Sequence, residues 1–275
     1  MRTRKKIYEG IDEVGTPDLK YYAFDWDDNI LKMPTSIFVL DENGDEVEMN
    51  TEDFAEYRTE IGKEPFNYRG KNIVGLNPKD AFRNFRTAGD EQFKMDVFTA
   101  QMGPAWDDFV EAVNNGSIFS IITARGHDPR TLREAVYNLI VTNHGGIDRE
   151  ELLKNLRKYR QFMDMEKMSD RELIDYYLDM CRFYPVSFGT GAEANPEEEK
   201  VKAMKEFVTY VKQLSEELKQ RAKIKNLVMN NFIPMIGFSD DDIRNVKVMN
   251  QYFEDEPDNI VRTYHTTDGR KVRKL

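Results

Sequence analysis

The chain contains little of what marks secreted or membrane-spanning proteins. Cys181 is its only cysteine, so no disulfide can form within the chain, and this usage is typical of a reducing compartment. The basic start MRTRKKIYEG is not followed by the apolar segment of a signal peptide. No apolar run approaches the roughly 20 residues that a membrane span requires. We therefore expect a cytoplasmic protein with no membrane partner.

Basic residues are also fewer than acidic residues. The 275 residues carry a formal net charge of −10, which disfavours non-specific binding to nucleic acids or anionic membranes. Both ends are locally basic, so a nucleic-acid partner stays open. The basic residues at the ends are Arg2, Arg4, Lys5, Lys6, Arg270, Lys271, Arg273 and Lys274. With 40% hydrophobic and 33% charged residues, the composition suits a folded protein with a sizeable core, and it leaves the oligomeric state undetermined.

Four short apolar runs have the character of β-strands, and helical patterns lie between them. The strand-like runs are YYAF (21–24), SIFSII (117–122), FYPVSF (183–188) and PMIGF (234–238). The helical patterns cover 129–142, 169–182 and 196–220. Strands that alternate with helices predict an α/β fold: a three-layer, Rossmann-like parallel sheet with helices on both faces.

Two of the helix starts carry specific signals. Asp128 precedes Pro129, an arrangement typical of an N-cap followed by the first helical turn. Ser169 is followed three residues later by Glu172, which is the pattern of a capping box.

One long stretch, 32–105, does not fit this alternation. Its segment IFVL-DENG-DEVEM predicts a β-hairpin that turns at Asn43-Gly44. We interpret 32–105 as a cap or flap insertion after the first strand, so that 1–31 and 106–275 form the core. A second insertion, mostly helical, is expected at about 145–182.

Acidic residues follow two of the apolar runs. Asp25 and Asp27 come after YYAF, and Asp240-Asp241-Asp242 follow PMIGF. Ligands of parallel α/β sheets bind beyond the carboxyl ends of the strands, so neighbouring strands would bring these clusters together. Close carboxylates resist ionisation unless a cation shares the site. Oxygen ligands without clustered cysteine or histidine favour a hard metal, and Mg²⁺ first.

Four motifs together resemble those of the haloacid dehalogenase (HAD) superfamily. FDWDDNIL (24–31) resembles the first motif, Asp-x-Asp-x-Thr/Asn at the end of strand one, and SIIT, ending at Thr123, resembles the second. Lys200 resembles the third, with Lys202 as an alternative, and IGFSDDDIRN (236–245) resembles the fourth. Each motif alone is ordinary, but their joint order across about 20–250 is fairly specific.

The resemblance implies an Mg²⁺-dependent phosphatase that hydrolyses a phosphomonoester through an aspartyl-phosphate intermediate. It implies that Asp25 is the nucleophile and that Asp27 is the acid and base, with its backbone carbonyl on the metal. An acid at this second position points to phosphatases. Thr123 would hydrogen-bond a phosphoryl oxygen, and Lys200 would offset the negative charge.

The remaining site residues also come from the resemblance. Asp240 or Asp241 would bind Mg²⁺, with Asn245 in support, and which of the two aspartates contacts the metal directly stays open. Asn29, Ala124 and Arg125 are the expected substrate contacts. Arg125 lies just past Thr123, and it could equally anchor the loop. The expected partner is a small phosphorylated substrate, and a polynucleotide end is an alternative. A non-catalytic binding protein on the same fold is the competing hypothesis.

Overall fold

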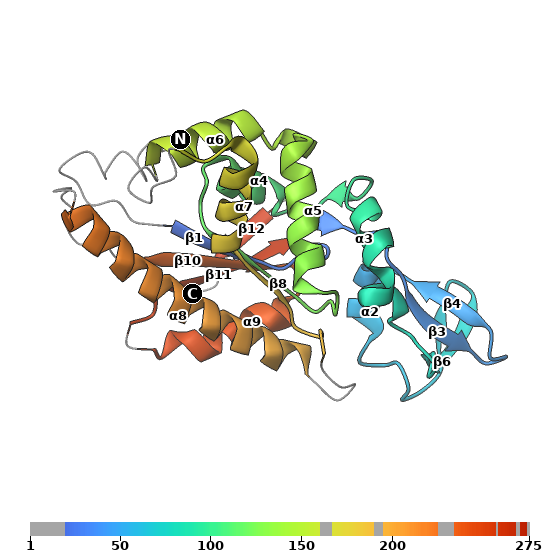
Figure 1. Ribbon diagram of the computed structural model, residues 1–275. Helices are drawn as coiled ribbons and strands as arrows, with labels where there is room; N and C mark the ends of the chain where they lie inside the picture. Colours follow the sequence, from blue (N-terminus) through green and yellow to red (C-terminus); the bar gives the residue numbers. More distant parts are fainter. Residues whose placement is uncertain are drawn as a thin grey trace.

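The computed structural model describes residues 20–159, 167–189, 195–224, 234–256, 258–267 and 270–273 (Figure 1). The basic residues near the N-terminus lie outside this part of the chain, as do the side chains of the basic C-terminal end. The basic ends therefore lie outside the described side chains, and a nucleic-acid partner stays a prediction.

A six-stranded sheet forms the centre of the molecule. Its order is β12-β11-β10-β1-β8-β9, and all neighbours pair in parallel except β11 and β12. The strands are β1 (Lys20–Phe24), β8 (Phe119–Thr123), β9 (Arg182–Pro185), β10 (Met235–Asp240), β11 (Val261–Thr267) and β12 (Arg270–Arg273). The first strand of the chain therefore lies in the middle of the sheet, with its carboxyl end beside those of β8 and β10.

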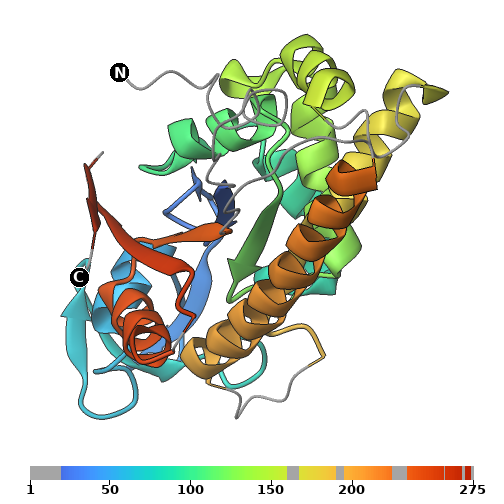
Figure 2. The same ribbon diagram turned by 90° about the vertical axis from the view of Figure 1, so that its left-hand side faces the viewer.

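Helices cover both faces of this sheet, as Figures 1 and 2 show. Four lie on one face: α4 (Trp106–Asn114), α5 (Pro129–Val141), α6 (Arg149–Tyr159) and α7 (Asp170–Met180). Two lie on the other: α8 (Pro196–Ile224) and α9 (Ile243–Glu254). The predicted three-layer α/β fold is confirmed. The stretch predicted as a helical insertion contains α6, α7 and a short 3₁₀ turn, η3 (His144–Gly146).

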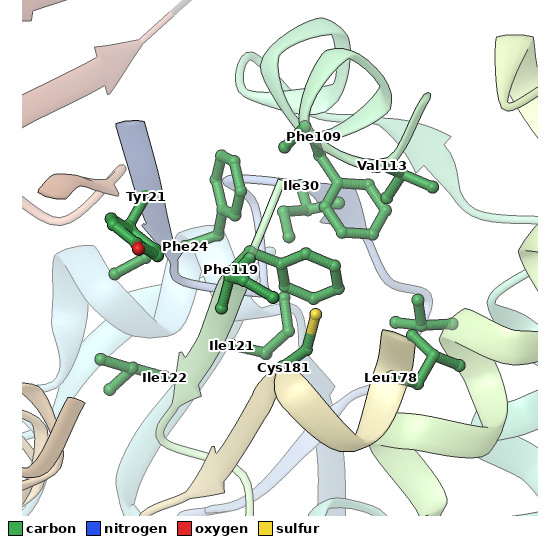
Figure 3. Close-up of a cluster of buried hydrophobic side chains, with 14 of the residues drawn as sticks. Tyr21, Phe24, Ile30, Phe109, Val113, Phe119, Ile121, Ile122, Leu178 and Cys181 are labelled. Carbon is green, nitrogen blue, oxygen red and sulfur yellow. The ribbon is translucent and has the colours of Figure 1, made fainter. Parts of the chain in front are cut away.

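Burial on both faces explains why the central strands are continuous apolar runs. All five residues of β8 are buried, as expected for a parallel strand between two helical layers. Figure 3 shows part of this core, where Phe24 and Phe119 approach Phe109. The ring centroids lie 5.7 Å apart for Phe24 and Phe109 and 5.5 Å apart for Phe109 and Phe119, both nearly perpendicular. These are favourable edge-to-face contacts.

The predicted helix starts are confirmed at both capping positions. The Asp128 side chain accepts a hydrogen bond from the backbone N–H of Arg130 at the start of α5. Ser169 and Glu172 form a complete capping box at the start of α7. Such caps satisfy backbone donors that a helix leaves without partners.

An antiparallel insertion follows β1. Its two ends meet where β2 (Leu31–Lys32) pairs with β7 (Gln101–Met102). A four-stranded sheet of order β4-β3-β6-β5 lies between them, and the predicted hairpin at Asn43-Gly44 joins β3 to β4. The elements of the insertion between β2 and β7 are β3 (Ile37–Asp41), β4 (Glu46–Met49), α2 (Thr51–Tyr57), β5 (Phe66–Tyr68), β6 (Lys71–Leu76), η1 (Arg83–Phe85), η2 (Thr87–Gly89) and α3 (Asp90–Asp96).

No helix within the described ranges is long and apolar enough to cross a membrane.

Candidate active site

The carboxyl ends of β1, β8 and β10 bring three of the sequence motifs to one edge of the sheet. Phe24 pairs with Ser239 on one side and with Ile121 on the other. The backbone N–H of Asp25 then donates to the carbonyl of Ser239 over 2.9 Å. The chain turns directly after β1, because the N–H groups of Ile30 and Leu31 both donate to the Trp26 carbonyl. Residues 25–29 are therefore held at the end of the strand.

Three carboxylates converge at this edge. One oxygen each from Asp25, Asp240 and Asp241 lies within 4.8 Å of the others. Asp25 and Asp240 are buried, and Asp241 is half-buried. Residues 215 positions apart in the sequence therefore meet because parallel pairing aligns the ends of β1 and β10.

Lys200 is the cation that faces this cluster. Its Nζ lies 2.9 Å from Asp25 Oδ1 and 2.8 Å from Asp240 Oδ2. Lys200 itself is buried, at the start of α8. Lys202 instead pairs with Glu199 on the exposed side of the same helix, at 2.5 Å. Of the two lysines that the sequence left open, Lys200 is the one at the cluster.

Burial makes the charge of this cluster costly. Desolvation raises the pKa of Asp25 well above its usual value, although Lys200 acts to lower it. Desolvation and the neighbouring carboxylates, Asp240 first, raise the pKa of Asp241 to about 9. Three buried or half-buried carboxylates face one ammonium, so a further cation would relieve the repulsion that remains.

The donor set fits a hard divalent cation. Asp25 Oδ1 is fully buried, and its one close partner among the described residues is the Lys200 ammonium at 2.9 Å. Those residues also give the Asp241 carboxylate no donor. Asp240 differs, since its oxygens accept from Lys200 Nζ, from the backbone of Asp242 and from Asn245. An oxygen-only cluster with open lone pairs is the coordination chemistry of Mg²⁺.

Asn245 contacts the cluster through Asp240. Its side-chain nitrogen donates to both oxygens of Asp240 over 3.0 Å. Such a contact can orient the Asp240 carboxylate, and the role of Asn245 in supporting a metal stays a prediction.

Asp27 points toward a different partner. Its carboxylate accepts hydrogen bonds from the guanidinium of Arg125, and Arg125 Nη2 lies 2.6 Å from Asp27 Oδ1. Thr123 lies beside it, and its hydroxyl is 3.5 Å from Asp27 Oδ2, at the limit of a hydrogen bond. The two aspartates of the first motif thus lie close enough to interact electrostatically, but their carboxylates face different cations.

The three residues expected to contact substrate occupy three different environments. Asn29 is fully buried: its side-chain nitrogen donates to the carbonyls of Asp25 and Ser239, and its oxygen accepts from Thr266. Ala124 is exposed. Arg125 is fully buried against Asp27. Their contact with substrate stays a prediction.

Some residues near the site carry no assignment from the sequence. Asp28 has a left-handed backbone (φ 55°), and burial raises the pKa of its side chain to about 6. It lines a cavity of about 320 Å³ together with Lys32, Thr51 and Gln101. Thr35 and Asp90 approach the site from the insertion. No local sequence signal distinguishes Thr35 or Asp90, because their positions depend on how the insertion folds back.

Comparison with known proteins gives no relative: no protein-family model, curated protein or solved structure matches the chain. The parallel strands of the central sheet, the antiparallel insertion after β1 and the buried carboxylates of Asp25, Asp240 and Asp241 are consistent with the HAD-like fold that the motifs resemble.

Proposed function

We propose that the protein is an Mg²⁺-dependent phosphatase that hydrolyses a phosphomonoester through an aspartyl-phosphate. The observation that carries this proposal is the convergence of Asp25, Asp240 and Asp241 beside Lys200. The order of the four motifs supports the reaction class.

In the first step the Asp25 carboxylate attacks phosphorus, and the bond from phosphorus to the ester oxygen breaks. Asp27 gives a proton to the departing alcohol, which leaves an aspartyl-phosphate on Asp25. In the second step Asp27 takes a proton from water, and that water attacks phosphorus and frees Asp25. Thr123 donates a hydrogen bond to a phosphoryl oxygen, and Lys200 compensates the negative charge on Asp25 and the phosphoryl group.

Mg²⁺ would be held by Asp25 and Asp241, with Asp240 beside them and the backbone carbonyl of Asp27 as a further ligand, and it would supply positive charge for the phosphoryl oxygens. The open lone pairs of Asp241 favour it over Asp240 as the direct ligand. Lys200 and Asn245 hold Asp240, so that this carboxylate orients the cluster.

The test of the nucleophile is Asp25→Asn, assayed by phosphate release from a panel of phosphomonoesters with Mg²⁺. We expect turnover to fall by at least about 1000-fold, because an amide is a poor nucleophile. Asp107→Asn is the matched control, since Asp107 is exposed on α4. If Asp25→Asn keeps wild-type turnover, the assignment is wrong.

The test of the metal site is thermal unfolding with Mg²⁺ and with a chelator. Mg²⁺ should raise the melting temperature of the wild type by mass action, and Asp241→Asn should remove most of that increase. Stabilisation by Mg²⁺ without turnover on a broad panel would support the non-catalytic alternative. The panel includes a phosphorylated oligonucleotide end, for which a steep loss of turnover with added salt would indicate a polynucleotide substrate.

A further inference from the structure

The Arg125 side chain is fully buried beside the site, and its guanidinium is directed at Asp27. Arg125 Nε lies 3.1 Å from Asp27 Oδ1 and 2.9 Å from Oδ2, and Arg125 Nη2 lies 2.6 Å from Oδ1. The planar fork of a guanidinium matches a carboxylate, and it fixes both position and orientation. Asp27 is therefore held by more than one bond, although its own side chain is partly exposed.

The insertion provides most of the remaining partners of this guanidinium. Nη2 also donates to the hydroxyl of Thr35 over 2.9 Å. The rings of Phe85 and Phe93 lie 4.6 Å and 4.9 Å from the guanidinium carbon, within the range of cation–π contacts. All three residues belong to the stretch between β2 and β7.

A second link to the insertion runs through His127. Its Nε2 lies 3.1 Å from Arg125 Nη1, and its Nδ1 lies 2.7 Å from Asp90 Oδ1 on α3. The backbone is tied as well, since the N–H of Gly126 donates to the carbonyl of Phe85 over 2.8 Å. Every nitrogen of the Arg125 guanidinium therefore has a partner within the protein.

We propose that Arg125 is a positioning residue of the proposed phosphatase, which holds the Asp27 carboxylate in place and is itself held by Thr35, Phe85, Phe93 and the His127–Asp90 pair. This inference rests on the proposed function. It gives Arg125 a role through Asp27 in place of direct contact with substrate. It also makes the insertion a structural part of the site, because the residues that fix Arg125 come from it.

The geometry predicts that lysine would replace this arginine poorly. An ammonium is a point charge without the fork that meets two carboxylate oxygens, and it stacks less well between two rings. Arg125→Lys keeps the positive charge next to Asp27 but removes the orientation. Proximity and orientation of an acid contribute a large share of its effect, so the variant separates charge from position.

The first experiment compares leaving groups. In Arg125→Lys we expect kcat to fall about 100-fold for an alkyl phosphate, whose poor leaving group needs the acid, but less than about 5-fold for p-nitrophenyl phosphate. KM should stay within about 2-fold, because substrate binding is not affected. Equal losses for both substrates, or a rise in KM alone, would overturn the proposal; the second result would instead favour direct contact with substrate.

The second experiment is a double-mutant cycle with Asp27→Asn. If Arg125 acts only through Asp27, Arg125→Lys should change kcat by less than about 2-fold once Asp27 is Asn. Losses that multiply would show an independent role and would refute the inference, whereas the phosphatase proposal would stand as long as Asp25→Asn is inactive. A wild type without turnover on any phosphomonoester would refute both.

Two further variants guard against a folding defect. Thr35→Val removes only the hydroxyl that Arg125 contacts, and it should reproduce the leaving-group selectivity at a smaller scale, about 3- to 10-fold. Arg83→Lys is the matched control, because Arg83 also pairs with a carboxylate, Glu46, and lies over the Phe38 ring within the insertion. It should leave the ratio of the two substrates unchanged. If Thr35→Val folds normally but does not change the ratio of kcat between the two substrates, the insertion does not fix Arg125.

Discussion

The central sheet and the four-stranded sheet of the insertion bury their residues in opposite ways. In the central sheet, β8 is buried along its whole length, and helices cover both faces. In the insertion, most residues of β6 are exposed. The Val74 and Leu76 side chains are 41% and 38% exposed. A parallel sheet between helical layers needs continuous apolar strands, whereas an antiparallel sheet can leave one face to solvent.

The cores differ as much as the sheets. The main core extends from β1 through β8 and the helices, and it includes Phe93 of α3 and Val97 directly after this helix. The outer part of the insertion has its own small cluster, formed by Val39, Met49, Tyr68 and Ile73. So small a cluster contributes little stability by itself. The outer insertion therefore depends on the contacts between insertion and core. Several of these contacts are polar and lie close to the site.

Phe119→Ala should have the largest effect on the central sheet. The Phe119 ring is fully buried and contacts the rings of Phe109, Tyr177 and Phe183. Its truncation should lower the free energy of unfolding by about 3–5 kcal/mol through lost burial and a cavity. Urea denaturation followed by circular dichroism measures this change. Phe188→Ala, at a ring that is 43% exposed, is the control and should cost less than about 1 kcal/mol.

Ile73→Ala should act locally, in contrast with Phe119→Ala. Ile73 is fully buried in the small cluster, so its truncation should lower the stability of the outer insertion by about 2–4 kcal/mol. We expect faster hydrogen exchange over 37–76 and unchanged exchange in β8 and β10, because the outer insertion opens without the core. Val74→Ala, at the exposed neighbour on β6, should change neither region. Faster exchange throughout the molecule would show that the two sheets unfold as one unit.

The same difference explains what the sequence predicts. The strands β1, β8 and β10 were predictable because their apolar runs end at polar residues, as YYAF ends at Asp25. The sequence reading missed β11, because its residues VRTYHTT form no continuous apolar run. The helix starts at Asp128 and Ser169 were predictable because capping is a local interaction. Of the insertion, the hairpin at Asn43-Gly44 was predicted from such a local signal. The N-cap of α2 at Asn50 is a second local signal, which the sequence reading missed.

The candidate site divides in a similar way. The cluster of Asp25, Asp240 and Asp241 follows from strand ends and parallel pairing, and the sequence could anticipate it. The partners of Arg125 could not be anticipated, because Thr35 and Asp90 reach it only after the insertion folds against the core. The positions of residues in the sequence do not show which of them make such long-range contacts. An arginine shortly after Thr123 is as compatible with substrate contact as with an internal ion pair.

The link through His127 should make the junction of core and insertion sensitive to acid. Burial lowers the pKa of His127, and the Arg125 charge lowers it further, against the opposing effect of Asp90 and Asp27. The folded protein therefore holds His127 neutral at a pH where the unfolded chain, with a pKa of about 6.5, takes up a proton. Stability should fall as pH drops below about 6.5. In His127→Gln the loss between pH 7 and 5, measured by urea denaturation, should be smaller; an identical loss would assign the acid sensitivity to other groups.

The smallest expected effect concerns the ion pairs that join α2 to the core. Arg58, at the end of α2, pairs with Glu197 at the start of α8, and its Nη2 lies 3.4 Å from Asp242 Oδ2 at the start of α9. These side chains are partly exposed, so Arg58→Gln should cost only about 0.5–1 kcal/mol, and less at high salt. The control is Arg69→Gln, because Arg69 pairs with Asp53 inside the insertion at 3.0 Å and joins nothing to the core. We expect Arg58→Gln, but not Arg69→Gln, to speed hydrogen exchange in α2. Equal exchange in both variants would mean that the junction is held by the buried contacts around Arg125 and Phe93 alone.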